Sequence, residues 1–472
     1  MASGWKRFDD ALDIYSRILQ GPWEAPRFGS MMLLCPELTS DMTGTKMVYL
    51  ELFGKPIIII NDIKTAQELL EKRAGIYSSR RQIRMLTEVI GFKALFGLMP
   101  YGDEWRTHRR MFRQHFSDRN LPKIQERILE FLRKSLLPNI LTSPEDIHGH
   151  VRDFIGGLSS SLTYGLPTQR QNDPLVRFAE QGWLVINHSG APGRYLVNLL
   201  SPLKYVPEWM PGSRFKQEAK EMRKTLDRLM EDPYQATVKA MESKAGRKTS
   251  FVQETLERLR DKPDFETQAR YVKQTACQIF GGLSETTATA TMTFILAMVI
   301  RPDVQRKAQE EVDSVVGDRL PEFADMPQLL YLSAVIKEAL RWNPATPLGV
   351  PHMTSDQDVY MGYYIPKNCT VIANAYSMLH DEDFYSDADE FKPERFITND
   401  GHLRQDIPDP ELVATFGFGR RVCPGSHVAR SMLYITAATI LSLFDISSGV
   451  DPDGKPVEVT PRFAPASLVS YV

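Results

Sequence analysis

Apolar residues recur every three or four positions through most of the chain, a spacing that is typical of amphipathic α-helices. It predicts helices over residues 62–73, 103–116, 121–137, 146–164, 175–188, 213–244, 251–262, 267–300, 302–316, 326–342 and 426–443. Runs of β-formers predict a hairpin around Gly54 and short strands over residues 359–365 and 370–374. Without an internal repeat or a low-complexity linker, the pattern favours one large domain, mainly α with small β-sheets, of the α+β class.

The helical segment over residues 267–300 would extend about 50 Å at a rise of about 1.5 Å per residue. Its middle, FGGLSETTATA, places two glycines beside Ser284, Glu285, Thr286 and Thr287 in an otherwise apolar helix. Each interior glycine weakens a helix by about 1 kcal/mol relative to alanine, so this polar notch needs a reason. A helix kink with satisfied hydroxyl groups is one interpretation, and a chemical role is the other.

The composition is that of an ordinary globular protein, with 42% hydrophobic and 25% charged residues. The net charge of −2 gives no basic footprint, so we expect no nucleic-acid partner. The four cysteines form no CxxC pair, which favours a reducing compartment. His427 lies four residues beyond Cys423, but structural zinc needs four ligands and no second pair lies nearby in the sequence.

Residues 1–45 are predicted to be an atypical N-terminal segment without a clear membrane anchor. No apolar stretch reaches the roughly eighteen residues that cross a bilayer, and the longest candidates are residues 57–60 and 294–300. Residues 5–19 instead predict an amphipathic helix. The predicted domain therefore covers residues 46–472.

Cys423 lies in the run FGFGRRVCPG, residues 416–425, just before the predicted helix over residues 426–443. An isolated cysteine is usually a buried structural residue. Here the glycines let backbone N–H groups turn toward the sulfur, and the positive end of the next helix points at it. This environment favours a thiolate, which can hold a metal.

The same run resembles the FxxGxRxCxG signature of the cytochrome P-450 family of haem-thiolate monooxygenases, through Phe416, Gly419, Arg421, Cys423 and Gly425. The resemblance implies the fold of that family and a haem b group whose iron takes Cys423 as its axial thiolate ligand. A thiolate in that position favours cleavage of the O–O bond of dioxygen. The resemblance also implies that Arg421 pairs with a haem propionate and that Phe416 packs near the sulfur.

The pair Glu285–Thr286 resembles the acid and threonine of the family's oxygen-binding helix. There Thr286 would hydrogen-bond to the bound dioxygen while Glu285 relays protons through water. Leu283 stands where the family often has glycine, and its bulk would narrow the oxygen groove. This departure leaves open an isomerase or dehydratase of the same fold that acts on a peroxide. A catalytically impaired haem-binding relative is a further alternative, because no final strand is evident after Pro461.

Glu338 and Arg341 form the ExxR pattern of the family, and Arg395 lies in a PERF-like element further along the chain. A surface ion pair at this spacing would contribute little to stability. The resemblance implies instead that the three residues form a buried structural network that locks the loop presenting the thiolate.

Trp105 and Arg109 match the WxxxR pattern of the family, and the resemblance implies that both reach a haem propionate. His352 resembles the residue that faces the other propionate. Without the resemblance, the Trp–Arg pair would be an ordinary packed helix face and the histidine a buried structural residue.

The predicted helix that carries Trp105 is basic. Within ten positions it contains Arg106, His108, Arg109, Arg110, Arg113 and His115. Such a run is usually a solvated face. In the family this helix lies where an acidic flavoprotein docks, so the resemblance implies electrons from a separate NADPH-dependent flavoprotein reductase.

Residues 199–212, LLSPLKYVPEWMPG, are apolar, aromatic and interrupted by prolines. They predict either a core-packed connection or, by resemblance, a segment that dips into a membrane surface with Tyr205 and Trp209. We therefore expect a monomer with peripheral membrane contact at the cytoplasmic face of the endoplasmic reticulum, or a cytoplasmic protein if that contact fails.

The function that this likeness predicts is a haem-dependent monooxygenase resembling fungal microsomal members of secondary metabolism. It would insert one oxygen atom of dioxygen into a small-molecule substrate. The segments that form the family's pocket are mostly apolar in this chain, which predicts an apolar substrate.

Overall fold

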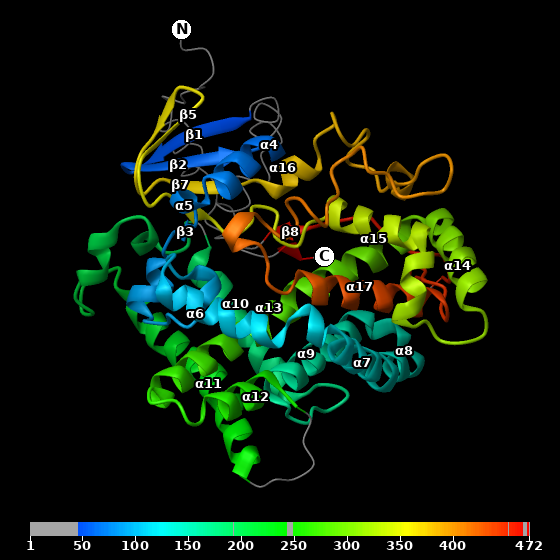
Figure 1. Ribbon diagram of the computed structural model, residues 1–472, viewed down its shortest axis with the longest axis horizontal. Helices are drawn as coiled ribbons and strands as arrows, with labels where there is room; N and C mark the ends of the chain where they lie inside the picture. The colour runs from blue at the N-terminus through cyan, green and yellow to red at the C-terminus, as the bar shows by residue number, and fades with distance from the viewer. Residues whose placement is uncertain (1–45, 192, 243–248, 452, 466–469, 472) are drawn as a thin grey trace.

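The computed structural model describes residues 46–191, 193–242, 249–451, 453–465 and 470–471 (Figure 1). The expectations for residues 1–45, including the amphipathic helix over residues 5–19, lie outside these ranges. The α-helices are α4 (Ile63–Ala66), α5 (Ala74–Tyr77), α6 (Asp103–His115), α7 (Leu121–Phe131), α8 (Leu137–Thr142), α9 (Ile147–Tyr164), α10 (Pro174–Gly190), α11 (Arg214–Glu242), α12 (Phe251–Leu259), α13 (Phe265–Ile300), α14 (Pro302–Val316), α15 (Leu330–Trp342), α16 (Ala375–Leu379) and α17 (Ser426–Leu441).

The described strands form one five-stranded sheet and two small pairs. The order in the sheet is β1–β2–β7–β4–β3, with β2 and β7 parallel and the other neighbours antiparallel. This sheet lies at the top left of Figure 1, and most of the helices lie below it. The strands are β1 (Met47–Leu52), β2 (Lys55–Ile60), β3 (Ser79–Arg80), β4 (His352–Met353), β5 (Asp358–Tyr360), β6 (Tyr363–Ile365), β7 (Thr370–Ala373), β8 (Ala464–Pro465) and β9 (Ser470–Tyr471).

The mainly α fold with small sheets is confirmed, and so is the hairpin of β1 and β2. Three predicted helices are wrong in detail, because local winding changes within them. The segment 62–73 is α-helical only over α4, and a π-helical stretch follows over Gln67–Lys72. A π-helical stretch over Leu132–Leu136 separates α7 from α8, so residues 121–137 are not one α-helix. The segment 326–342 begins within a 3-10 turn that contains Pro327, and α15 starts only at Leu330.

Two strand predictions are also wrong. The segment 359–365 is a hairpin rather than one strand, because Met361 and Gly362 turn the chain with φ angles of 51° and 83°. A final strand does follow Pro461, since β8 pairs antiparallel with β9. Two-residue strands are too short to show alternation in a sequence, so pairing across the chain defines them.

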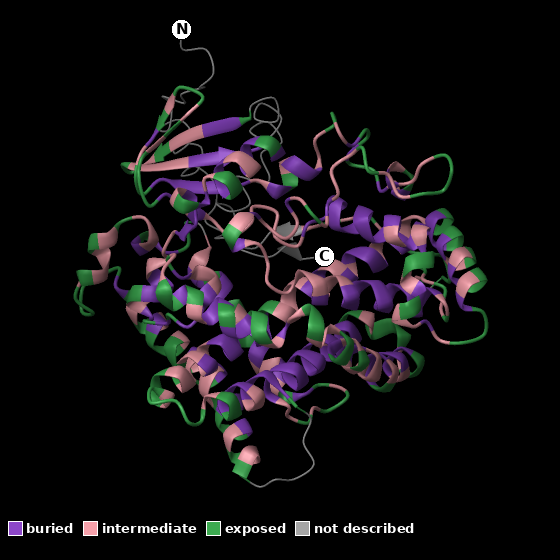
Figure 2. Cartoon of the chain, in the orientation of Figure 1, coloured by how far each residue is buried: buried purple, intermediate pink, exposed green. Residues whose placement is uncertain are grey.

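Helix α13 passes through the centre of the helical part, where it contacts α6, α9, α12, α15 and α17. Figure 2 shows buried residues along these elements. One glycine of the predicted notch serves this packing. A Cβ at Gly281 would lie 1.3 Å from Nε1 of Trp183 on α10, so the indole ring occupies the space that the glycine leaves.

By length and composition, α13 is also apolar enough to cross a membrane, with a mean hydropathy of 1.4 over its most apolar window. By mean hydropathy, the expectation that no segment is long and apolar enough to cross a membrane is wrong. Hydroxyl residues interrupt the apolar run of α13, but its average hydropathy stays apolar. Half of the window is buried inside the domain. Together with its helical neighbours, this burial identifies α13 as a core helix of the folded domain.

Glu338, Arg341 and Arg395 form one buried network. Arg341 donates to both carboxylate oxygens of Glu338, with Nε–Oε2 and Nη2–Oε1 distances of 2.7 and 3.0 Å. Arg395 donates from Nε to Oε1 of Glu338 at 3.1 Å, and the backbone N–H of Lys392 donates to the same oxygen at 2.7 Å. The side chains of Glu338 and Arg341 are fully buried, so the surface interpretation of this pair is wrong.

The network ties α15 to residues 379–395 rather than to the cysteine loop directly. Arg341 also donates to the carbonyl groups of Leu379 and Glu390, and Arg395 donates to that of Ser386. None of the hydrogen bonds described for these two arginines reaches residues 416–425. The network therefore fixes the chain segment that precedes the cysteine loop.

We expect Arg341→Met to lower the free energy of unfolding by about 3–5 kcal/mol, because it removes two of the hydrogen bonds that a fully buried carboxylate receives. Urea unfolding followed by circular dichroism measures this change. The control is Arg404→Met, which breaks an exposed pair with Asp406 and should cost less than about 1 kcal/mol. Equal effects of the two substitutions would contradict the structural role of the network.

Candidate functional site

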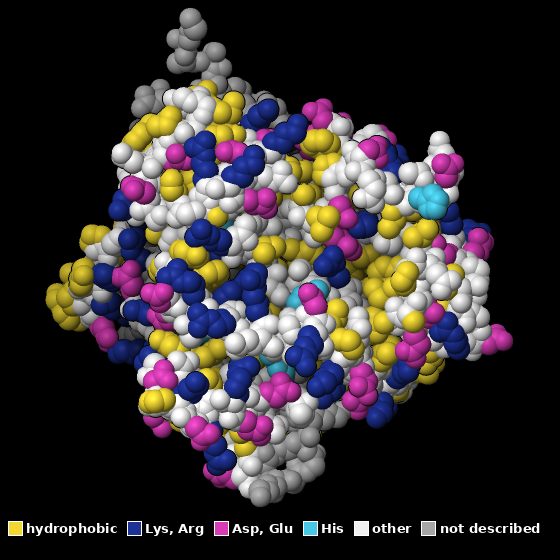
Figure 3. All heavy atoms as spheres, in the orientation of Figure 1, with side chains coloured by type: hydrophobic (Ala, Val, Ile, Leu, Met, Phe, Trp, Pro, Cys, Tyr) yellow, Lys and Arg dark blue, Asp and Glu magenta, His cyan; other side chains and the backbone are white. Residues whose placement is uncertain are grey.

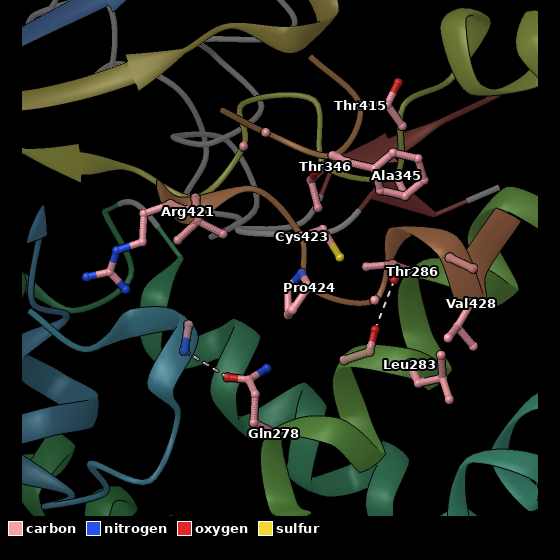
Figure 4. Close-up of a pocket in the computed structure, with 18 of the residues that line it drawn as sticks. Gln278, Leu283, Thr286, Ala345, Thr346, Thr415, Arg421, Cys423, Pro424 and Val428 are labelled. Atoms are coloured by element: carbon pink, nitrogen blue, oxygen red, sulfur yellow. Dashed lines mark hydrogen bonds between the residues drawn. The ribbon is translucent and has the colours of Figure 1, made fainter. Parts of the chain in front are cut away.

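A cavity of about 310 Å³ lies between α6, α13, the loop before α17 and the edge of the large sheet. Seven of the predicted site residues line it, although they come from distant parts of the sequence. They are Trp105, Arg109, Thr286, His352, Phe416, Arg421 and Cys423. In Figure 4 the sulfur of Cys423 and the side chain of Thr286 point toward the same space.

The loop that carries Cys423 is closed by its own backbone. The N–H of Cys423 donates to the carbonyl of Phe416 at 2.8 Å. Gly417 and Gly419 have φ angles of 76° and 55°, which favour glycine. A Cβ at Gly419 would lie 2.1 Å from the carbonyl oxygen of Leu70, so the loop packs directly on the π-helical stretch Gln67–Lys72. Backbone geometry therefore requires glycine at residues 417 and 419, whereas Gly425 of the motif has a φ of −101° that other residues also adopt.

The protein environment alone does not make Cys423 a thiolate. Burial raises the pKa of this thiol above its ordinary value, and the backbone N–H of Gly425 and the charge of Arg109 lower it less than burial raises it. Burial therefore opposes the thiolate that the local sequence favours. A bound metal cation would supply the missing stabilisation, because thiols deprotonate when they coordinate a metal.

Two arginines from the predicted motifs lie beside this loop. Arg421 donates to the carbonyl groups of Ser78 and Met99, each at 2.7 Å, and Arg109 donates to that of Val422 at 2.7 Å. Burial and the charge of Arg109 lower the pKa of Arg421 to about 9. Burial and Arg113 lower the pKa of Arg109 to about 10. Both cations are therefore held in a poorly hydrated place.

Arg80 is a third buried arginine at the same end of the cavity, and the sequence analysis missed it. It lies on β3 opposite His352 of β4, and both residues are buried and line the cavity. Arg80 donates to the carbonyl of Val350, and burial and Arg421 hold the pKa of Arg80 well below its ordinary value. Nδ1 of His352 bonds to the carbonyl of Tyr77 at 2.8 Å. No sequence signal separates Arg80 from the neighbouring Arg81.

The three arginines need an anionic partner. None of the described carboxylates forms an ion pair with Arg80, Arg109 or Arg421, and the Nε groups of Arg80 and Arg109 are buried without a hydrogen-bond acceptor. Burying a cation without a partner costs several kcal/mol. A flat cofactor with two carboxylates, such as a haem, fits this set of donors and the cysteine sulfur opposite the hydroxyl notch.

Thr286 and Glu285 lie on different faces of α13. Thr286 lines the cavity, and its hydroxyl donates to the carbonyl of Gly282 at 3.0 Å. Glu285 lines a separate small crevice on the other side of the helix, where its Oε1 lies 3.7 Å from Nη2 of Arg152. That arginine also pairs with Glu180 at 3.0 Å. The structure therefore does not bring Glu285 into the cavity, and its role as a proton relay stays a prediction.

Leu283 and Thr287 complete the cavity face of α13 around Thr286. Leu283 is partly buried there, but the residue before it is Gly282, which leaves the adjacent stretch of the helix bare. The hydroxyl of Thr287 is buried and has no partner within the described chain, whereas that of Thr286 donates to Gly282. The glycine that the family motif places at residue 283 is thus present one position earlier.

The basic run on α6 divides into two groups. His108 and Arg109 are buried, and His115 pairs with Glu254 at 2.8 Å. The exposed residues are Arg106, Arg110 and Arg113. Figure 3 shows basic side chains gathered over the position of α6. A solvated face therefore describes only part of this run.

The cysteine loop, the hydroxyl notch and the unpaired arginines form a site in a helical protein that fits a flat metal cofactor with two carboxylates. The family profile described as Cytochrome P450 matches residues 21–464. Cytochrome P450 monooxygenase ple1 of Rhodocybe pseudopiperita is 38% identical over 455 residues, covering 95% of this chain and 86% of that protein. Tryptamine 4-monooxygenase of Psilocybe cyanescens is 35% identical, covering 89% of this chain and 82% of that protein. The chain therefore belongs to the cytochrome P450 family.

Membership establishes a haem-iron cofactor, a small-molecule substrate and a redox partner as general features of the protein. A further relative named as a monooxygenase is COX2 of Coprinopsis cinerea, which is 38% identical, covering 88% of this chain and 78% of that protein. The protein is thus a haem-dependent monooxygenase of the type found in fungal secondary metabolism. The alternatives of a peroxide isomerase and of an impaired haem binder are not supported by these relationships.

Proposed function

We propose that Cys423 ligates the haem iron as a thiolate and that the enzyme oxidises a mainly apolar small molecule with electrons from a separate NADPH-dependent reductase. The observation that supports this proposal is the convergence of Cys423, Thr286 and three arginines without carboxylate partners on one cavity. A haem with a thiolate ligand supplies the activation of dioxygen. The protein residues supply binding, orientation and protons.

Each group has a distinct task. Arg80, Arg109 and Arg421 would hold the haem carboxylates by charge-assisted hydrogen bonds, and Trp105 and His352 would complete that shell. Phe416 would cover the sulfur. The hydroxyl of Thr286 faces the cavity and would hold a proton near the reacting oxygen, with Glu285 as its source once that side chain turns toward the cavity or connects through water.

The exposed arginines of α6 support the expected docking of an acidic flavoprotein reductase. Arg106 pairs with Asp103, whereas Arg110 and Arg113 have no ion pair within the described chain. Arg420, from the cysteine loop, is also exposed and donates to Tyr101. Exposed charges near the ligand loop steer an oppositely charged partner toward the cofactor and raise the association rate.

The segment between α10 and α11 supports peripheral membrane contact at the cytoplasmic face of the endoplasmic reticulum. Tyr205 and Trp209 are 76% and 79% exposed, so the alternative of a core-packed connection is wrong. Figure 3 shows an apolar protrusion at the left edge, where Figure 1 draws this segment. Exposed tyrosine and tryptophan side chains are favoured at the headgroup level of a bilayer.

We expect Cys423→Ala to abolish the thiolate-type band in the carbon monoxide difference spectrum of the reduced protein, because the sulfur ligand is removed. Cys369→Ala, at a buried cysteine that does not line the cavity, should keep the band. Persistence of the band in Cys423→Ala would contradict the ligand assignment.

Arg80→Met should speed haem transfer to excess apomyoglobin by about tenfold, since a charge-assisted hydrogen bond contributes about 1.5–3 kcal/mol. The haem-free variant should be no less stable than the haem-free parent, because the substitution removes an unpaired buried charge. Arg84→Met, at an arginine that pairs with Glu88, is the control. If Arg80→Met retained haem as well as this control does, Arg80 would not contact the cofactor.

Thr286→Ala should raise the ratio of peroxide released to NADPH consumed several-fold, because the hydroxyl that holds a proton in the cavity is lost. The assay uses added reductase and a ligand that shifts the Soret band. Thr291→Ala is the matched control on the same helix, since its buried hydroxyl bonds to the carbonyl of Thr287 and does not line the cavity. Unchanged coupling in Thr286→Ala would remove Thr286 from the mechanism.

A further inference from the structure

Gln278 places a carboxamide in the wall of the cavity, two helical turns before Thr286 on α13. Its Oε1 accepts a hydrogen bond from the backbone N–H of Gly97 at 3.2 Å, drawn as a dashed line in Figure 4. A Cβ at Gly97 would lie 3.1 Å from this oxygen, so the absence of a side chain lets the amide approach. The acceptor end of Gln278 is therefore occupied by the chain itself.

The donor end of Gln278 faces along the helix toward the reaction site. A Cβ at Gly282 would lie 3.3 Å from Nε2, and Gly282 in turn accepts the hydroxyl hydrogen bond of Thr286. In the part of the chain that the structure describes, Nε2 donates no hydrogen bond. Gly97 and Gly282 thus set the orientation of the Gln278 carboxamide. Its oxygen accepts a hydrogen bond from the chain, and its N–H donors point along α13 past Gly282.

The rest of the cavity makes this donor unusual. Apart from the arginine and histidine end and a few threonines, the wall is apolar, with Ile279, Leu283, Ala290, Leu340 and Val428 among its members. No aspartate, glutamate or lysine lines it within the described residues. A bound acceptor at this donor would gain about 0.5–1.5 kcal/mol from the hydrogen bond. A cationic substrate group would therefore find no carboxylate side chain among the described lining residues.

We propose that Gln278 is a specificity-determining residue that donates a hydrogen bond to a neutral, mainly apolar substrate carrying an acceptor oxygen remote from the oxidised carbon. The assignment rests on the proposed haem ligation at Cys423. Eight residues separate Gln278 from Thr286, which corresponds to about 12 Å along the helix axis. The substrate class is therefore a ketone, ester, ether or alcohol whose oxygen lies on the order of 10 Å from the carbon that is oxidised.

The test uses imidazole probes that bind the haem iron of the intact enzyme and shift its Soret band. Two series of graded chain length are titrated: 1-alkylimidazoles, and imidazol-1-yl alkan-2-ones with the same number of heavy atoms. At the chain length where the carbonyl reaches Nε2, the ketone should bind about threefold to tenfold more tightly than its alkyl partner. A preference at no chain length would overturn the proposal.

Variants separate the donor from the shape of the wall. The ketone preference should disappear in Gln278→Leu and in Gln278→Met, which keeps the length of the side chain. It should persist in Gln274→Leu, one turn earlier on α13 and outside the cavity lining. In Gln278→Glu, an imidazolyl alkylamine of matched length should bind more tightly than it does to the parent enzyme, because a carboxylate replaces the donor.

The outcomes distinguish this inference from the proposed function. A ketone preference that survives in Gln278→Leu would overturn the role of Gln278 while leaving haem ligation intact. If neither probe series shifts the Soret band of the parent enzyme, the haem site itself is wrong and the inference falls with it.

Discussion

Three arginine side chains are buried around one end of the cavity, and no carboxylate in the described part of the chain balances them. Burial lowers the pKa of each, which shows how poorly that place solvates a cation. Haem carboxylates would remove this cost, so cofactor binding and fold stability are linked in this protein. The cysteine loop, the edge of the sheet and the middle of α6 each contribute one of these arginines to the cavity.

In the network around Glu338, the buried charges are balanced by the protein itself. There a fully buried carboxylate receives hydrogen bonds from two arginines and a backbone N–H, so the charge is satisfied by the chain alone. Such a site needs no ligand and serves architecture. The contrast between the two clusters is informative, because similar arginines have different roles according to whether a carboxylate is supplied by the protein.

The two faces of helix α13 have different roles: one packs against neighbouring elements and the other borders the cavity. On one face Gly281 accommodates the indole of Trp183, and Glu285 pairs with Arg152. On the other face Gly282 and Thr286 border the cavity together with the carboxamide of Gln278. A helix that carried larger side chains at both glycines would lose the close contact with α10 and the open stretch beside the reaction site.

The motifs in the sequence were enough to identify the family and to select seven of the residues that line the cavity. Cys423, Arg421 and Phe416 lie within one short loop whose backbone conformation depends on local glycines, so their spacing carries the information. Long periodic helices were also predictable, because their apolar faces repeat within the segment itself. Short strands such as β3 and β8 were not, since pairing with distant residues defines them.

Only the tertiary structure decided what depends on contacts between distant segments. It placed Glu285 outside the cavity, brought Arg80 beside His352 and turned the amide of Gln278 by means of Gly97. It also showed that burial raises the pKa of Cys423, although the local sequence favours a thiolate. Local spacing determines which groups are available, whereas burial and the direction of a side chain are set by elements that meet only when the chain folds.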